Sequence, residues 1–401
     1  MRLFDRSEVF FKVTLIPSFS PGRRREEVEL KVFMNLSEFK LKLQRLRGFL
    51  RVRKLQGVLL STRANYSWLT CGRANKIRSD IEKGVASLWV TQRSVELWCN
   101  NIEENRFRVE EAKGLPFEYR VHPWYEKFSP PRHQGAKKEF GFNTASDDGA
   151  FGTLNLKDEI AELRWSLTRE EAARYRKVGL LSGQAMEIVG HKLKRGWQEE
   201  QVAAELSREL VLRGLEPSVV LVAADERLRR FRHPLPTANK IKQTVMMVIC
   251  AKGQGLIANL TRLIHFGPLS LDLKLRHRAC LSVECALWAA SRPGVEAGLA
   301  FRAGAGEYSL QGFPGEWKKH HQGGPTGYET RDYLATMGEK RKWVENQAVA
   351  WNPSITGTKS EDTLLVTSKG LELLTPTPHW PMVKMEYGGK KYSRPDILVR
   401  K

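Results

Sequence analysis

The sequence lacks several features that would point to a function by themselves. It has no run of about 18 consecutive apolar residues, the minimum for a helix that spans a bilayer. Its five cysteines contain no CxxC pair, which excludes the common zinc-finger and thioredoxin spacings. Heptads, internal repeats, a phosphate-binding loop and an aromatic-basic RNA signature are also missing. Sparse, unpaired thiols are typical of a reducing compartment, so we expect a cytoplasmic protein without a membrane partner.

What is present in excess is positive charge. Lys and Arg number 66 against 45 Asp and Glu, which gives a formal net charge of +21. Such a balance is compatible with nucleic acid, an anionic surface or an anionic ligand. Because the charge is diffuse and no nucleic-acid-binding motif accompanies it, nucleic acid is the least favoured partner.

Hydrophobic periodicity divides the chain into four segments. Residues 1–33 form a basic N-terminal extension, either a loose segment preceding a start at Met34 or an ordered arm. Residues 34–155 alternate strands and helices and end in a loop rich in proline, glycine and charge, which predicts an α/β domain with a linker. Residues 156–375 begin with long helices and continue with strands, which predicts helices on a mixed or antiparallel sheet. Residues 376–401 carry six basic and two acidic residues and are interpreted as a basic C-terminal tail.

Local signals support this division. Thr168 and Glu171 predict a capping box for a long helix, and Ser37 is a candidate cap for an earlier one. Residues 198–212 and 275–290 are predicted helices, and residues 219–223, 245–251 and 256–260 are predicted strands. The turn at residues 252–255 joins the last two strands as a hairpin.

Six segments, in order and spacing, resemble the aminopeptidase P / prolidase / creatinase family, known for its pita-bread fold. They are residues 55–70, 163–214, 258–262 (ANLTR), 320–327 (HHQGGPTG), 350–355 (AWNPSI) and 360–363 (SEDT). The resemblance covers about residues 36–375. It implies an α/β and α+β chain, with a creatinase-like N-terminal domain followed by a pita-bread domain.

The resemblance also implies a degraded metal site. The family's peptidases hold two divalent metals with two Asp, one His and two Glu, and the metals activate a water. The matching positions here are Val248, Asn259, His321 (or His320 in another register), Asn352 and Glu361. Valine has no donor atom and asparagine offers only a neutral oxygen. We therefore expect no dinuclear metal centre and no cofactor, with one weakly held metal as an open alternative.

Creatinase is the family member that hydrolyses a C–N bond without metal, using a histidine as acid and base. The residue that resembles this histidine is His233, whose side chain suits proton transfer near neutral pH. We expect His233, His321 and Glu361 to line one pocket, with Glu361 orienting a histidine. The alternatives are a turn-capping role for His233 and a structural salt bridge for Glu361.

The expected substrate-binding residues are Arg73, Gly323, Gly324, Asn259 and Asn352. The glycine pair would let backbone approach a ligand closely, or form a tight turn. Arg73 follows the loop that in the family reaches a neighbouring active site in the dimer, where it would clamp a carboxylate. The resemblance accordingly implies a homodimer.

The sequence thus predicts an enzyme, a metal-independent hydrolase of a C–N bond in a small amide, amidino or peptide-like substrate. The ligand is a small molecule or peptide, and an anionic one fits the charge. The alternative is a non-catalytic, peptide-binding pseudo-peptidase. A conventional Xaa-Pro metallo-aminopeptidase is disfavoured by Val248, Asn259 and Asn352.

Overall fold

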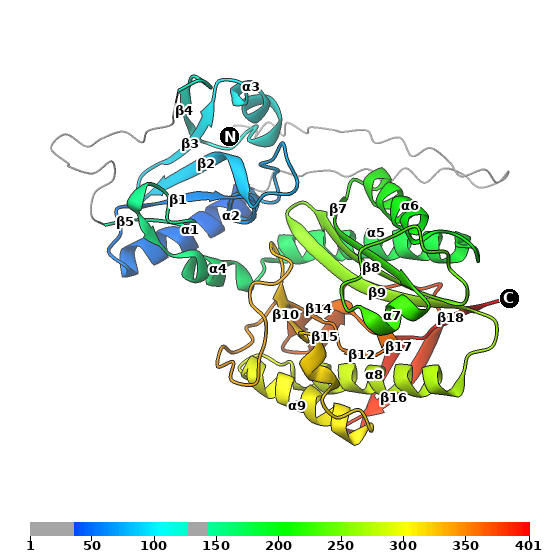
Figure 1. The fold of residues 1–401 in the computed structure, drawn as a ribbon. Helices are drawn as coiled ribbons and strands as arrows, with labels where there is room; N and C mark the ends of the chain where they lie inside the picture. The colour runs from blue at the N-terminus through cyan, green and yellow to red at the C-terminus, as the bar shows by residue number, and fades with distance from the viewer. Residues whose placement is uncertain (1–35, 127–142) are drawn as a thin grey trace, which may run out of the picture.

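The computed structural model describes residues 36–126 and 143–401, which form two domains (Figure 1). The predicted N-terminal extension and much of the proposed linker lie outside the described residues. Among the helices that are described, none combines the length and hydrophobicity that a membrane crossing requires.

The N-terminal domain is a six-stranded mixed sheet with helices packed on it. Its strands follow the order β4-β3-β2-β1-β5-β6. Helix α1 begins one residue before the predicted cap Ser37, and its predicted apolar face of Phe39, Leu43, Leu46 and Leu50 is buried. The elements are α1 (Leu36–Val52), β1 (Gly57–Thr62), α2 (Arg63–Leu69), β2 (Lys83–Thr91), β3 (Val95–Asn100), α3 (Glu104–Arg106), η1 (Phe107–Glu111), β4 (Glu118–His122), β5 (Thr144–Ser146), η2 (Ala150–Gly152) and β6 (Leu154–Asn155).

The first half of the second domain packs helices against a sheet of order β18-β9-β8-β7. The predicted capping box is present, because Thr168 and Glu171 each accept a hydrogen bond from the other's backbone N–H at the start of α5. The predicted hairpin is also confirmed, with Lys252 paired to Ile257 before its turn. The elements are α4 (Lys157–Trp165), α5 (Arg169–Lys192), α6 (Glu199–Leu212), β7 (Glu216–Ala224), α7 (Glu226–Arg230), β8 (Thr244–Gly253) and β9 (Leu256–Phe266).

The second half adds a sheet of order β10-β11-β14-β15, with α8 and α9 beside it (Figure 1). This sheet and the β7–β9 sheet meet through β9 and β14, where Thr261 and Glu361 form a β-bridge. The elements are α8 (Leu271–Ala290), α9 (Ala297–Leu310), η3 (Glu316–Lys319), β10 (Gly323–Thr326), β11 (Gln347–Trp351), β12 (Ser354–Ile355), β13 (Thr358–Lys359), β14 (Asp362–Thr367) and β15 (Gly370–Leu373).

The C-terminal residues do not form a tail, so that prediction was wrong. They fold into β16 (Met382–Tyr387), β17 (Lys390–Pro395) and β18 (Leu398–Arg400), and β18 joins the first sheet parallel to β9. Arg394 is fully buried, between Glu284 and Asp362. The basic composition led to the wrong prediction of a tail. In this segment the charges alternate with residues that face inward, which is the pattern of half-buried strands.

Candidate active site

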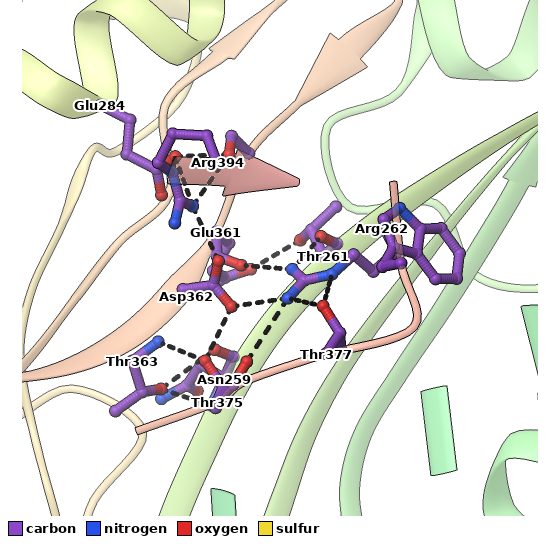
Figure 2. A network of polar contacts seen from close by, with 12 residues as sticks. Asn259, Thr261, Arg262, Glu284, Glu361, Asp362, Thr363, Thr375, Thr377 and Arg394 are labelled. Atoms are coloured by element: carbon purple, nitrogen blue, oxygen red, sulfur yellow. Dashed lines mark hydrogen bonds and ion pairs between the residues drawn. The ribbon is translucent and has the colours of Figure 1, made fainter. Parts of the chain in front are cut away.

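One face of the β8–β9 hairpin carries the positions that matched the family's aspartates. Val248 pairs with Thr261, and Cys250 pairs with Asn259, so these side chains leave the same face of the two strands. Glu361 reaches this face from the start of β14, where its Oε2 accepts a hydrogen bond from Thr261 Oγ1 at 2.9 Å (Figure 2). The structure therefore brings Asn259, Thr261 and Glu361 to one face of the hairpin.

Two cations neutralise Glu361. Lys359 Nζ lies 2.7 Å from its Oε2, and Arg331 Nη2 lies 3.0 Å from its Oε1. Burial alone would raise the pKa of this carboxyl, but Lys359 and Arg331 outweigh it and hold the pKa at about 2. The group is a carboxylate at neutral pH, and one negative charge faces two positive ones.

A buried charge network surrounds Asp362, the residue that follows Glu361 (Figure 2). Arg262 Nη2 lies 2.9 Å from Asp362 Oδ1, and Arg394 bridges Asp362 Oδ2 and Glu284 at 2.7 Å each. Thr375 and Thr377 satisfy remaining polar atoms of Asp362 and Arg262. Because each of these charges has a hydrogen-bonded partner, the network joins β9, β14, α8 and β17 and fixes the backbone on which Glu361 sits.

Three histidines gather near Glu361. His233 Nε2 lies 3.0 Å from His320 Nε2, and one ligand atom from each of His233, His320 and His321 lies within 4.8 Å of the others. His320 ends η3, His321 precedes β10, and His233 follows α7 in the chain. The prediction that His233 and His321 share a site is consistent with this geometry, and His320 belongs to the site as well.

The loop that carries His233 is held in place by buried acids. Glu199, at the start of α6, accepts hydrogen bonds from the backbone and side chain of Thr237 and pairs with Arg227. Arg232 Nη2 lies 2.6 Å from Glu316 Oε2 of η3, the short helix that leads into His320. These contacts draw two segments that are far apart in the sequence together, and they place His233 against His320.

The pKa of each of the three histidines is lowered. Burial is the largest cause for each, and the neighbouring cation Lys359 adds to it, while Arg331 lowers the pKa of His233 and His321 as well. The pKa of His320 falls to about 2 and that of His321 to about 4, while His233 is the most exposed of the three. The cluster is therefore neutral at pH 7.

Glu361 does not orient a histidine, contrary to the sequence prediction. Its oxygens accept from Thr261, Lys359 and Arg331, and within residues 36–126 and 143–401 no histidine donates a hydrogen bond to it. The alternative, a structural salt bridge, describes its contacts. Lys359 and Arg331 were missed because neither lies in a family ligand position, although Lys359 stands two residues before Glu361.

Gly323 and Gly324 serve the packing of strand β10. Their backbone dihedrals are φ 102° and φ 157°, and a Cβ on either would lie 2.1 Å from Ala350 O or 2.4 Å from Tyr333 O. The pair is neither a tight turn nor an open ligand cradle. It lets β10 pass close to β11 and the segment at Tyr333, and this positions His321 just before the strand.

Arg73 lies away from the histidine cluster of its own chain. Its Nη1 donates to Glu110 O at 3.0 Å, and its side chain lines a different pocket, at the tip of the β8–β9 hairpin. Its predicted role in a dimer partner's active site stays a prediction.

The residues present do not fit the family's dinuclear metal centre. Val248 is buried and apolar, Asn259 and Asn352 are uncharged, and Glu361 is already paired with two cations. Among the described residues, Asn259 Oδ1, Asn352 Oδ1 and His321 Nδ1 are buried without a hydrogen-bond partner. The three histidines match the donor set of a single zinc ion instead.

Comparison with known proteins gives a consistent result. Residues 173–368 match the model of metallopeptidase family M24. An uncharacterized peptidase of Staphylococcus aureus (strain MW2) is 24% identical over 244 residues, which cover 59% of this chain and 68% of the relative.

Solved structures share the fold. The prolidase of Pyrococcus horikoshii OT3 superposes with a TM-score of 0.71 at 18% identity, over 84% of this chain and 98% of that one. The N-terminal domain of FACT complex subunit SPT16 from chickpea gives 0.63 at 11% identity, over 86% and 97%. At these identities the likeness is one of fold. Residues 173–368 are thus similar to metallopeptidase family M24, and the solved structures add that the fold is shared.

Proposed function

We propose that this protein is a hydrolase that cleaves a C–N bond of a small amide, amidino or peptide-like substrate without a dinuclear metal centre. The observation that carries the proposal is the pairing of Glu361 with Lys359 and Arg331 beside three neutral histidines. The side-chain cations take the place that two metal ions hold in the charge balance of the family's peptidases.

In the proposed reaction on an amide or peptide bond, His233 accepts a proton from water as the water oxygen bonds to the carbonyl carbon; in an amidino substrate the amidino carbon takes that place. It is the best base of the cluster because its ring is the most exposed and the larger pKa reductions fall on His320 and His321. Lys359 and Arg331 stabilise the negative charge that develops on the carbonyl oxygen. The C–N bond then breaks, and the proton held by the histidines passes to the leaving nitrogen.

The test is hydrolysis of a panel of amides, amidines and dipeptides, including acidic ones, after exhaustive treatment with a chelator. We expect turnover to survive the chelator and to fall about 10²-fold or more in His233→Ala. His379→Ala, an exposed histidine elsewhere on the domain, is the matched control and should retain full activity. Unchanged turnover in His233→Ala would reject the mechanism. Loss of activity with the chelator and its recovery with one equivalent of zinc would assign a mononuclear metal to the three histidines.

A second candidate is a non-catalytic, peptide-binding pseudo-peptidase. It is favoured by the shared fold with an SPT16 domain, which is described as part of a complex subunit and not as a peptidase. Reproducible peptide binding with no product after long incubation would support this function over hydrolysis. A conventional Xaa-Pro metallo-aminopeptidase would require two bound metals per chain, which elemental analysis measures.

A further inference from the structure

A second polar pocket lies between the two domains, apart from the histidine cluster. It has a volume of about 470 Å³ and is walled by the segment after α2, the α6–β7 connection and the tip of the β8–β9 hairpin. Lys252, in its wall, is four residues along β8 from Val248, which is about 13 Å in an extended strand. The pocket therefore uses residues that the proposed hydrolytic site does not.

The walls of this pocket are held closely together. A Cβ on Gly72 would lie 2.8 Å from Gln254 O, and a Cβ on Gly255 would lie 2.7 Å from Ser67 Cβ. Both glycines have positive φ, so larger residues at these positions would push the N-terminal domain away from the hairpin tip. The backbones of the segment after α2 and of the hairpin tip are therefore in close contact, and the pocket between them is preformed.

The charge in the pocket is unbalanced. Four cationic side chains, those of Arg63, Arg73, Lys76 and Lys252, share the lining with one carboxylate, Glu216. Glu216 is already engaged, because both of its oxygens lie 3.0 Å from Arg63 Nη2 and Lys76 also pairs with it. Within the part of the chain that the structure describes, no carboxylate forms an ion pair with Arg73 or Lys252.

We propose that this pocket binds an oxyanion group, a carboxylate or a phosphate, through Lys252 and Arg73. An unpaired, largely buried ammonium is unfavourable by itself and becomes favourable when an anion joins it. The state of Lys252 agrees, because burial and the nearby Arg63 and Lys76 lower its pKa to about 8, against the raising effects of Glu329 and Glu216. A bound anion would raise that pKa and keep the lysine charged.

Calorimetric titration with sulfate, which keeps its charge throughout, tests the site in the full chain. We expect wild type to bind sulfate, more tightly at pH 7 than at pH 9, and Lys252→Met and Arg73→Met to weaken binding about tenfold or more. Lys113→Met, an exposed lysine of the N-terminal domain, should leave the affinity unchanged. Malonate in parallel separates the sources, because binding of malonate alone would restrict the site to carboxylates.

Amine labelling gives an independent readout. Because its pKa is lowered, a larger fraction of the Lys252 side chain is uncharged at pH 8 than of an ordinary lysine. Acetic anhydride at limiting concentration should therefore modify Lys252 faster than Lys113, and sulfate should suppress that modification.

The proposal is overturned if neither anion binds or protects, or if Lys252→Met binds sulfate as well as wild type. Lys252→Met removes an unpaired charge, so it should keep the thermal midpoint of wild type. An unchanged midpoint shows that weaker sulfate binding by this variant does not come from misfolding. His233→Ala should bind sulfate normally, so the two proposals fail separately.

Discussion

Replacing Glu361 with glutamine tests the charge balance of the candidate active site. The carboxyl is fully buried, and its pKa falls from 4.5 to about 2 on folding. A shift of that size corresponds to about 3 kcal/mol of stabilisation at neutral pH. Glutamine keeps the shape of the side chain but leaves Lys359 and Arg331 facing each other without a counter-charge. We expect Glu361→Gln to lower the free energy of unfolding by about 3 kcal/mol at pH 7.

The pH dependence follows from the sign of the shift. Because the pKa of Glu361 is lower in the folded state, its stabilisation is present above about pH 4.5 and is lost as the pH falls towards about 2. Urea unfolding of wild type and Glu361→Gln across this range measures the difference, which should narrow below about pH 4.5. Glu200→Gln, an exposed acid on α6, is the control and should change stability by less than about 0.5 kcal/mol.

A second substitution tests whether the unpaired cations cause the loss of stability in Glu361→Gln. Lys359→Met in the Glu361→Gln background removes one of the two unpaired cations and should recover part of the lost stability. If Glu361→Gln is as stable as wild type at pH 7, or if the second substitution destabilises it further, the carboxylate is not the counter-charge that we describe.

Three further outcomes are expected. Lys359→Met removes a cation that lowers the histidine pKa values, so the pKa of His233 measured by NMR should rise; an unchanged value would show that burial alone sets it. Gly323→Ala should lower stability by on the order of 2–4 kcal/mol in thermal unfolding, since its Cβ would lie 2.1 Å from Ala350 O, whereas Gly327→Ala, with nothing within 4 Å, should be nearly neutral. Removal of residues 376–401 should leave the second domain unfolded or aggregated by circular dichroism and gel filtration, because Arg394 and β18 are lost; a folded, monodisperse product would restore the tail interpretation.

The fold was accessible from the sequence because its signals are local. Capping by Thr168, the apolar face around Leu46 and the hairpin at residues 252–255 each depend on residues a few positions apart. The family motifs then placed those elements in the right order. The C-terminal strands escaped because an alternating, charge-rich segment has the composition of a tail, and only tertiary contacts such as those of Arg394 reveal its burial.

Motif order identifies positions, so the sequence could place His233, His321 and Glu361 near one another, and in the structure they are neighbours. That they form the active site stays a prediction. Their roles depended on Arg331, which lies 30 residues before Glu361 and pairs with its Oε1, and on His320, whose ring packs against His233. Such pairings arise from the meeting of β9, β14 and the loop after α7, which no local pattern encodes. The dimer and the cytoplasmic location stay predictions.

The pairing of Glu361 with Lys359 and Arg331 also limits how this site could acquire a dinuclear metal centre. Substitutions V248D, N259D and N352E would put carboxylates at the positions that match the family's metal ligands. Glu361, the carboxylate already present at a matching position, is paired with Lys359 and Arg331, and these cations would compete with a metal ion for its oxygens. Acquiring a dinuclear centre would therefore demand the loss of Lys359 and Arg331 together with the gain of ligands. A variant with only one of these changes would carry unmatched buried charge. We therefore expect each single change to lower stability before a metal can bind.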